Sequence, residues 1–181
     1  MHDLANLEDR ISEIYYNYYS DVYRFLICFS GNKSDAEDMT QEVFIRILKN
    51  LPSLNKKSKI KTWIFSIAKH VAVDNYRKKK IISFLTDGVL TKLESADKGP
   101  SEIMEQEEIK RIIHSAISNL KPNYRTVVIL RGINEFSIKE TSEILQCSEA
   151  KVKVNYHRAL KELKKDLEIF SKKEVFEYAK G

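Results

Sequence analysis

Residues 59–80, KIKTWIFSIAKHVAVDNYRKKK, decide the fold because they form one long helical pattern with two different faces. On a helix, apolar side chains share one arc wide enough to face a protein core: Ile60, Trp63, Ile64, Ile67, Ala68 and Val71. The opposite arc combines aromatic rings with basic side chains: Phe65, Lys69, Tyr76, Arg77 and Lys80. Rings that stack on bases, beside cations that hold phosphates, are typical of single-stranded nucleic-acid binding. An amphipathic core helix with a basic tail explains the same pattern, so this stretch alone leaves both interpretations open.

The composition of the 181 residues favours an all-α protein, because five glycines and three prolines supply few tight turns. Cys28 and Cys147 stand far apart and no CxxC pair occurs, which predicts reduced thiols in a cytoplasmic protein. We find no apolar run of membrane-span length and no signal-peptide core near the N-terminus. The four histidines share no metal-ligand spacing, and phosphate-loop and nucleophile-elbow motifs are missing, so we expect neither catalysis nor a metal or other cofactor.

Charge alternates along the chain, although the net charge is only +5. Residues 51–80 carry nine basic side chains and one acidic one, whereas residues 81–108 carry two basic and seven acidic ones. A general polyanion binder would be basic throughout. The alternation therefore suggests two nucleic-acid contacts, with other surfaces that meet different partners.

The N-terminal part predicts three helices before residue 52. Apolar spacing over residues 4–29 indicates two of them, interrupted near residues 17–20, and Gly31-Asn32 ends the second. Ser34 with Glu37 forms a capping box that starts the third helix. Its expected buried stripe is Met39, Val43, Phe44, Ile47 and Leu48.

The exposed side of this third helix offers Asp38, Gln41, Glu42 and Ile45. Clustered carboxylates can ligate divalent cations, but no loop here supplies the carbonyl ligands of an EF-hand. Two interpretations stay open: helix capping with solubility, or an acidic docking face for a basic helical partner.

The C-terminal part predicts a second domain after an acidic stretch without sustained periodicity. We expect two small helical domains, 1–82 and 108–170, joined by a flexible acidic linker over 83–107 and followed by a tail, 171–181. Helices are expected near residues 101–119, 122–133, 137–146 and 148–170.

The last two of these helices form a helix-turn-helix pattern. Ser137 and Glu140 make a capping box, and Gln146-Cys147 is a turn before the next cap, Ser148. Gln146 stands where a glycine is common, and glutamine would be strained in a left-handed conformation. The final helix has an apolar stripe of Val152, Tyr156, Ala159, Leu160, Leu163, Leu167 and Phe170.

The outward arc of the final helix has the side chains that a major-groove reader uses. Basic side chains bind guanine acceptors or phosphates, and an apolar side chain contacts a thymine methyl. The candidates are Lys151, Lys153, Val154, His157, Arg158 and Lys161. An ordinary helical hairpin with a solvated basic face is the alternative.

Three blocks in this order resemble the bacterial sigma-70 family, in its extracytoplasmic-function group of RNA polymerase sigma factors: SDAEDMTQEVFIRILKN, KTWIFSIAKHVAVDNYRKKK, and the stretch LKPNYRTVVILRGINEFSIKETSEILQCSEAKVKVNYHRALKELKK. The first two are similar to region 2 and the third to region 4. Within the group, the resemblance points to the sigma-X-like type of Gram-positive bacteria.

The resemblance implies roles for particular residues. Asp38, Gln41, Glu42 and Ile45 would dock on the β′ clamp helices of core RNA polymerase. Lysine-rich loop residues and the helix after them would capture the −10 single strand: Asn55, Lys56, Lys57, Lys59, Phe65, Lys69, His70, Tyr76, Arg77 and Lys78. Lys153, His157 and Arg158 match −35 readout positions, and the second domain would meet the β flap.

The function that the resemblance implies is promoter recognition and DNA melting in transcription initiation, for a cell-envelope or extracytoplasmic stress regulon. A membrane-linked anti-sigma factor is an implied partner, and no small-molecule substrate is expected. The alternative is a stand-alone helix-turn-helix transcriptional regulator whose first domain senses a signal or dimerises.

Overall fold

The computed structural model describes residues 2–51, 59–86 and 104–178, and over these ranges it contains helices and no strand. The first bundle consists of α1 (His2–Ser30), α2 (Lys33–Asn50) and α3 (Ile60–Thr86). The second bundle consists of α4 (Met104–Asn119), α5 (Pro122–Val128), the π-helical turn η2 (Ile129–Ile133), α6 (Ile138–Leu145) and α7 (Glu149–Tyr178). The all-α expectation is confirmed for the part of the chain that is described.

Helix α1 is continuous, so the predicted interruption near residues 17–20 is wrong. No glycine or proline breaks this stretch, and rings support it on one side. Tyr15 and Tyr19 lie with their ring centroids 4.8 Å apart, and both contact Phe44 of α2. Packing of one helix on another therefore outweighs the modest helix propensity of the residues between the tyrosines.

The turn between α1 and α2 uses a different cap from the predicted one. Gly31 has a positive φ of 67°, which suits the residue that ends a helix. The N-cap is Asn32 and not Ser34: the Asn32 side chain accepts a hydrogen bond of 3.0 Å from the backbone N–H of Asp35. Helix α2 therefore begins one residue before Ser34, and the predicted capping box with Glu37 is replaced by an asparagine cap.

The buried faces of α2 and α7 are narrower than the sequence pattern suggested. In α2 the buried arc is Ala36, Met39, Thr40, Val43 and Ile47. Leu48 was expected in this stripe, but it is 43% exposed, because it lies about 100° around the helix from Ile47. Leu160 of α7 is likewise 44% exposed, one position beyond the buried Ala159.

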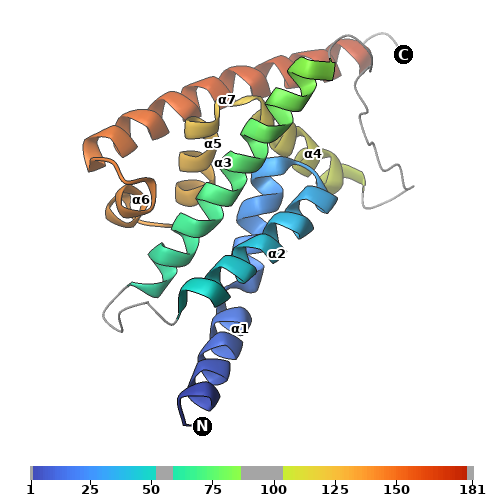
Figure 1. Ribbon diagram of the computed structural model, residues 1–181. Helices are drawn as coiled ribbons and strands as arrows, with labels where there is room; N and C mark the ends of the chain where they lie inside the picture. The colour runs from blue at the N-terminus through green and yellow to red at the C-terminus, as the bar shows by residue number, and fades with distance from the viewer. Residues whose placement is uncertain (1, 52–58, 87–103, 179–181) are drawn as a thin grey trace.

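Helix α3 is the member of the first bundle that faces the second. It has α1 and α2 on one side and α5 and α6 on the other (Figure 1). Its buried residues Ile64, Ala68 and Val71 complete the core of the first bundle. The same continuous core cluster includes Phe136 and Ile144 of the second bundle. The two bundles are therefore packed together and share buried apolar surface.

A smaller core holds the second bundle itself together. Its buried members are Leu120, Val127, Val128, Val152 and Ala159. The packing of α5 against α7 fixes the direction in which α7 presents its opposite face.

The predicted domain limits stay a prediction. Helix α3 extends to Thr86 and α4 begins at Met104, so both run into the predicted linker of residues 83–107. The rest of that linker, 87–103, and the end of the tail, 179–181, lie outside the described residues.

Candidate nucleic-acid interface

The helix-turn-helix is built by local hydrogen bonds that the sequence predicted. The Ser137 hydroxyl accepts a bond of 3.1 Å from the backbone N–H of Glu140, whose carboxylate accepts a bond of 2.8 Å from the backbone N–H of Ser137. The Ser137 hydroxyl also donates to this carboxylate over 2.6 Å, and the bonds that it receives from the hydroxyl and the backbone N–H hold the pKa of Glu140 below its usual value. The predicted capping box is therefore confirmed.

The turn after α6 passes through a left-handed residue. Gln146 has φ of 53° and ψ of 48°, the conformation in which the sequence analysis expected strain. The backbone N–H of Cys147 donates to the carbonyl of Ser142 over 3.1 Å. Ser148 then starts α7, its hydroxyl accepting from the backbone N–H of Lys151 over 3.3 Å. The turn thus has ordinary C-cap geometry, with glutamine in place of the favoured glycine.

All six predicted groove-reading side chains of α7 are exposed: Lys151, Lys153, Val154, His157, Arg158 and Lys161. Val152 and Ala159 are buried on the opposite face. None of the four bases Lys151, Lys153, Arg158 and Lys161 has an ion pair among the described residues. This arc is free to meet the acceptors of base edges and phosphates.

Phe65 of α3 does not lie on an exposed face, and that expectation is wrong. Its ring is fully buried, with centroids 5.9 Å from Phe25 of α1 and 4.6 Å from Phe136. Phe136, itself 1% exposed, comes from the loop before α6. Phe25 of the first bundle and Phe136 of the second bundle therefore both cover the ring that was expected to stack on a base.

Tyr76 is also partly covered by the second bundle and packs against the shared core. The Arg125 guanidinium lies 5.4 Å from the centroid of the Tyr76 ring and 5.1 Å from that of Phe29. An arginine of the second bundle thus occupies a face of a ring predicted for DNA.

The cations of α3 are more accessible than its rings. His70, Arg77 and Lys78 are exposed, and Lys69 is half-buried. Burial and the nearby charge of Arg77 lower the pKa of Lys69. Lys59, just before α3, forms an ion pair of 2.6 Å with Glu143 of α6. Asn55, Lys56 and Lys57 lie outside the described residues.

Arg125 and Phe136 were missed by the sequence analysis, although they join the two bundles. Arg125 is 6% exposed and donates to the carbonyl of Phe29 at the end of α1 over 2.8 Å, and to the carbonyls of Leu120 and Ser118. Burial lowers the pKa of its guanidinium. An arginine before the apolar run TVVIL was the one available signal, because a base inside a buried helix must find acceptors.

The acidic face of α2 is open to solvent. Asp38, Gln41 and Ile45 are exposed, and Glu42 is half-buried and accepts a bond of 2.7 Å from Arg46. No group of three or more metal-ligating side chains occurs within the described ranges. None of the helices described there combines the length and apolar character that a membrane span needs.

Comparison with known families matches both bundles. The family model for sigma-70 region 2 matches residues 14–81, and that for sigma-70 region 4 matches residues 110–163. The first match covers α1 from residue 14, all of α2 and α3 to residue 81, and the second includes α6 and α7 to residue 163.

Relatives of similar length match most of the chain. The ECF RNA polymerase sigma factor SigX of Bacillus subtilis is 36% identical over 167 residues, which cover 90% of this chain and 86% of the relative. SigM of the same organism, also an ECF RNA polymerase sigma factor, is 37% identical and covers 85% of this chain and 93% of its own.

Solved structures show the same fold at lower identity. The sigma factor RpoE of Bartonella quintana, solved with the anti-sigma factor NepR, has a TM-score of 0.70 at 22% identity, covering 90% of this chain and 98% of its own. CnrH, solved with the cytosolic domain of CnrY, has a TM-score of 0.68 at 17% identity and covers 90% of each chain. Both family models and relatives above 30% identity thus agree with the two-bundle geometry, and the chain belongs to the extracytoplasmic-function (ECF) group of the sigma-70 family.

Proposed function

We propose that this sigma factor binds core RNA polymerase, directs it to promoters with −10 and −35 elements, and helps to melt the DNA. The protein would act through binding alone, without catalysis. The observation that carries the proposal is the capped helix-turn-helix, whose second helix α7 presents an exposed arc with four lysine and arginine side chains. Family membership supports the same role.

The −35 element would be read as duplex by α7. The first turns of a recognition helix reach base edges, so Lys153, His157 and Arg158 are proposed to face bases, with Val154 against a thymine methyl. Lys151 and Lys161, near the two ends of the arc, would neutralise phosphates.

The −10 strand would be held by the face of α3. His70 is proposed to line the pocket for an unstacked base, while Lys69, Arg77 and Lys78 hold phosphates. Asn55, Lys56, Lys57 and Lys59 of the preceding loop would complete the site.

The rings of α3 can serve this site only if the bundles separate. Phe65 lies under Phe136, Tyr76 lies under Arg125, and Lys59 is paired with Glu143. Each of these contacts joins the first bundle to the second. We therefore infer that strand capture requires an open arrangement, which is reached on the polymerase.

Polymerase docking is assigned to the acidic face of α2. Asp38, Gln41, Glu42 and Ile45 would meet the β′ clamp helices, and the second bundle would meet the β flap. Exposure of Asp38, Gln41 and Ile45 supports this assignment.

The setting of the protein is proposed from its relatives. We place it in the cytoplasm, in control of a cell-envelope or extracytoplasmic stress regulon, with a membrane-linked anti-sigma factor as inhibitor. ECF relatives and the complexes of RpoE with NepR and of CnrH with CnrY support this setting.

Transcription in vitro with core polymerase on a genomic DNA library tests the proposal. We expect specific transcripts whose start sites share −10 and −35 sequences. Asp38→Lys should abolish co-purification with core enzyme while duplex binding by α7 is unchanged, and Lys49→Gln, at the exposed end of α2, is the matched control. Tight duplex binding that is indifferent to core polymerase would instead support a stand-alone regulator.

A further inference from the structure

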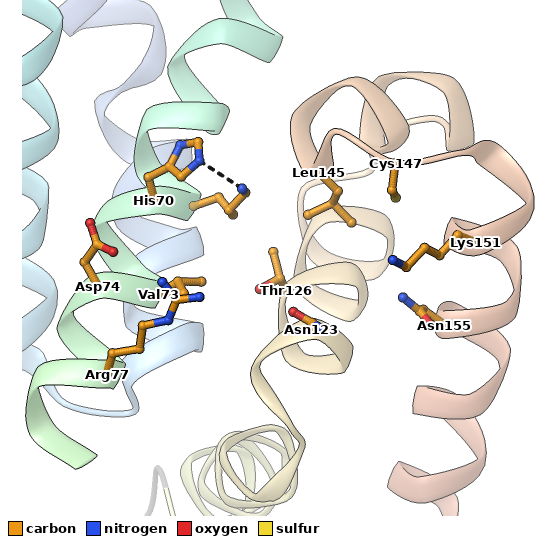
Figure 2. Close-up of a pocket in the computed structure, with 11 residues that line it drawn as sticks. His70, Val73, Asp74, Arg77, Asn123, Thr126, Leu145, Cys147, Lys151 and Asn155 are labelled. Carbon is orange, nitrogen blue, oxygen red and sulfur yellow. Dashed lines mark hydrogen bonds between the residues drawn. The ribbon is translucent and has the colours of Figure 1, made fainter. Parts of the chain in front are cut away.

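A cleft of about 340 Å³ lies between the two bundles, with walls from α3, α5 and α7. Figure 2 shows Lys151 and Asn155 of α7 directed toward α3, and Arg77 of α3 directed toward α5. Lys69 of α3 lines the same cleft. Three cations from two bundles thus border one space.

Lys69, Arg77 and Lys151 take part in none of the ion pairs found among the described residues. The pKa of Lys69 is lowered, first by burial and then by the charge of Arg77, with a partial offset from Asp74, so its surroundings disfavour the charged form of Lys69. An anion in the cleft would reverse that effect, because it would compensate all three charges at once.

The one carboxylate of the lining, Asp74, is shared between Lys69 and a cation outside the cleft. Asp74 lies on the side of α3 that faces away from α7 (Figure 2), and its Oδ2 is 3.9 Å from the Arg46 guanidinium of α2. Its charge is therefore shared with a cation outside the cleft. The space between α3 and α7 keeps a positive balance.

Two amide side chains also line the cleft. Asn123 of α5 and Asn155 of α7 supply N–H donors, whereas the hydroxyl of Thr126 donates to the carbonyl of Pro122 over 2.7 Å. A cleft of this volume is at the lower end of the range for small-molecule sites. Cations combined with amide donors match the oxygens of a phosphate group.

We propose that the cleft binds a small phosphate-bearing anion, held by Lys69 and Arg77 from the first bundle and by Lys151 from the second. Because its ligands come from both bundles, the anion stabilises their packed arrangement. The bound anion also engages Lys69, Arg77 and Lys151, which are assigned to promoter phosphates, so it would compete with DNA; this consequence rests on the proposed function.

The two cysteines provide a direct assay on the natural chain. Cys147 lines the cleft and is half-buried, whereas Cys28 is 6% exposed and burial raises the pKa of its thiol to about 11. A thiol reagent near neutral pH should therefore label Cys147 selectively. Bound anion should slow that labelling by a factor of 1 + [L]/Kd, about tenfold at nine times Kd.

Pyrophosphate is the probe, at ionic strength held constant with sodium chloride. Protection of Cys147 by pyrophosphate supports the site. Lys69→Gln combined with Lys151→Gln should remove the protection, while Lys49→Gln and Lys139→Gln, exposed lysines outside the cleft, should keep it. Unchanged melting temperatures would show that all variants fold.

Parallel titrations with orthophosphate and ATP identify the source of the phosphate. Stronger protection by ATP than by pyrophosphate assigns a nucleotide, and equal protection assigns an inorganic polyphosphate. Unchanged labelling up to about 10 mM of all three, ten times a Kd of about 1 mM, overturns the proposal. So does protection that survives the double substitution. The assay contains neither DNA nor polymerase, so its failure leaves the proposed function intact.

Discussion

The two helices proposed to meet DNA differ in what covers them. On α7 the six candidate side chains are exposed, and the helix packs through its opposite face. On α3 the candidate ring Phe65 is fully buried beneath Phe136, although the neighbouring cations reach solvent. The difference teaches that a face of one bundle can be part of the core when a second bundle packs on it. Exposure of α3 is therefore a property of the arrangement of the bundles.

The largest expected effect comes from removing the ring that covers α3. Phe136→Ala should lower the free energy of unfolding by about 3–5 kcal/mol, because it leaves a cavity beside Phe65 and Phe25. Loss of the contact with Phe136 should also make the ring of Phe65 on α3 more accessible to solvent and to DNA. Free protein should then bind a single-stranded −10 oligonucleotide more tightly, measured by fluorescence anisotropy. Phe136→Leu is the control, and unchanged affinity in Phe136→Ala would break the comparison.

The second effect concerns the arginine that joins the bundles. Arg125→Met should cost roughly 2–3 kcal/mol in urea unfolding, since the carbonyls of Phe29 and Leu120 lose a charged donor. Hydrogen exchange should rise at the end of α1, where Phe29 lies. Arg125→Lys keeps the charge, and its free energy of unfolding should lie between those of the unmodified chain and Arg125→Met. An unfolding midpoint equal to that of the unmodified chain would show that Arg125 does not hold the bundles together.

A third test sharpens the description of α7. Arg158→Ala should weaken −35 duplex binding by roughly 1–3 kcal/mol and relax the base preference at one position, if Arg158 reads a base edge. Lys161→Ala should weaken binding to every sequence alike and reduce the salt dependence. Competition binding with single-base variants of the −35 site measures both. Equal losses on all sequences for Arg158→Ala would make it a phosphate contact.

The smallest effect is local to the cap of α6. Ser137→Ala should destabilise the protein by about 1 kcal/mol, because Glu140 loses its capping partner. The pKa of Glu140 is lowered in the folded state, so this stabilisation is present above the unfolded carboxyl pKa and is lost as pH falls through the folded pKa. Stability of the variant, followed by thermal melting between neutral and acidic pH, should therefore fall less on acidification. An unchanged pH profile would contradict the role of this cap.

Local features of the sequence predicted the second bundle better than the first. Ser137 and Glu140 act on backbone groups within one turn, and Ser148 begins α7 as expected. The continuity of α1 depends instead on the contact of Tyr19 with Phe44, a residue of another helix. Such contacts join distant positions, so helical periodicity does not contain them.

The candidate site follows the same division. The arc of α7 could be located because helical spacing alone places bases such as Lys153 and Arg158 on one face. Phe65 was placed on an open face because its neighbours at helical spacing are polar or basic. The rings that bury it are Phe25, 40 positions earlier in the chain, and Phe136, 71 positions later. The position of a residue along a helix indicates the side of the helix on which it lies. Only the packing of the other elements determines which residues cover that side.

The π-helical turn η2 makes this packing depend on the number of residues between α5 and α6. The backbone N–H of Asn134 reaches back to the carbonyl of Ile129, five residues earlier, and that of Phe136 reaches Leu130. One extra residue in a turn rotates the chain that follows by about 100° relative to a plain α-helix. A homologue shortened by one residue here would keep its caps and charges, yet it would aim a different side chain at α3. Insertions and deletions in this loop are thus a route by which related chains can weaken or strengthen the packing of the two bundles without any change in their DNA-binding side chains.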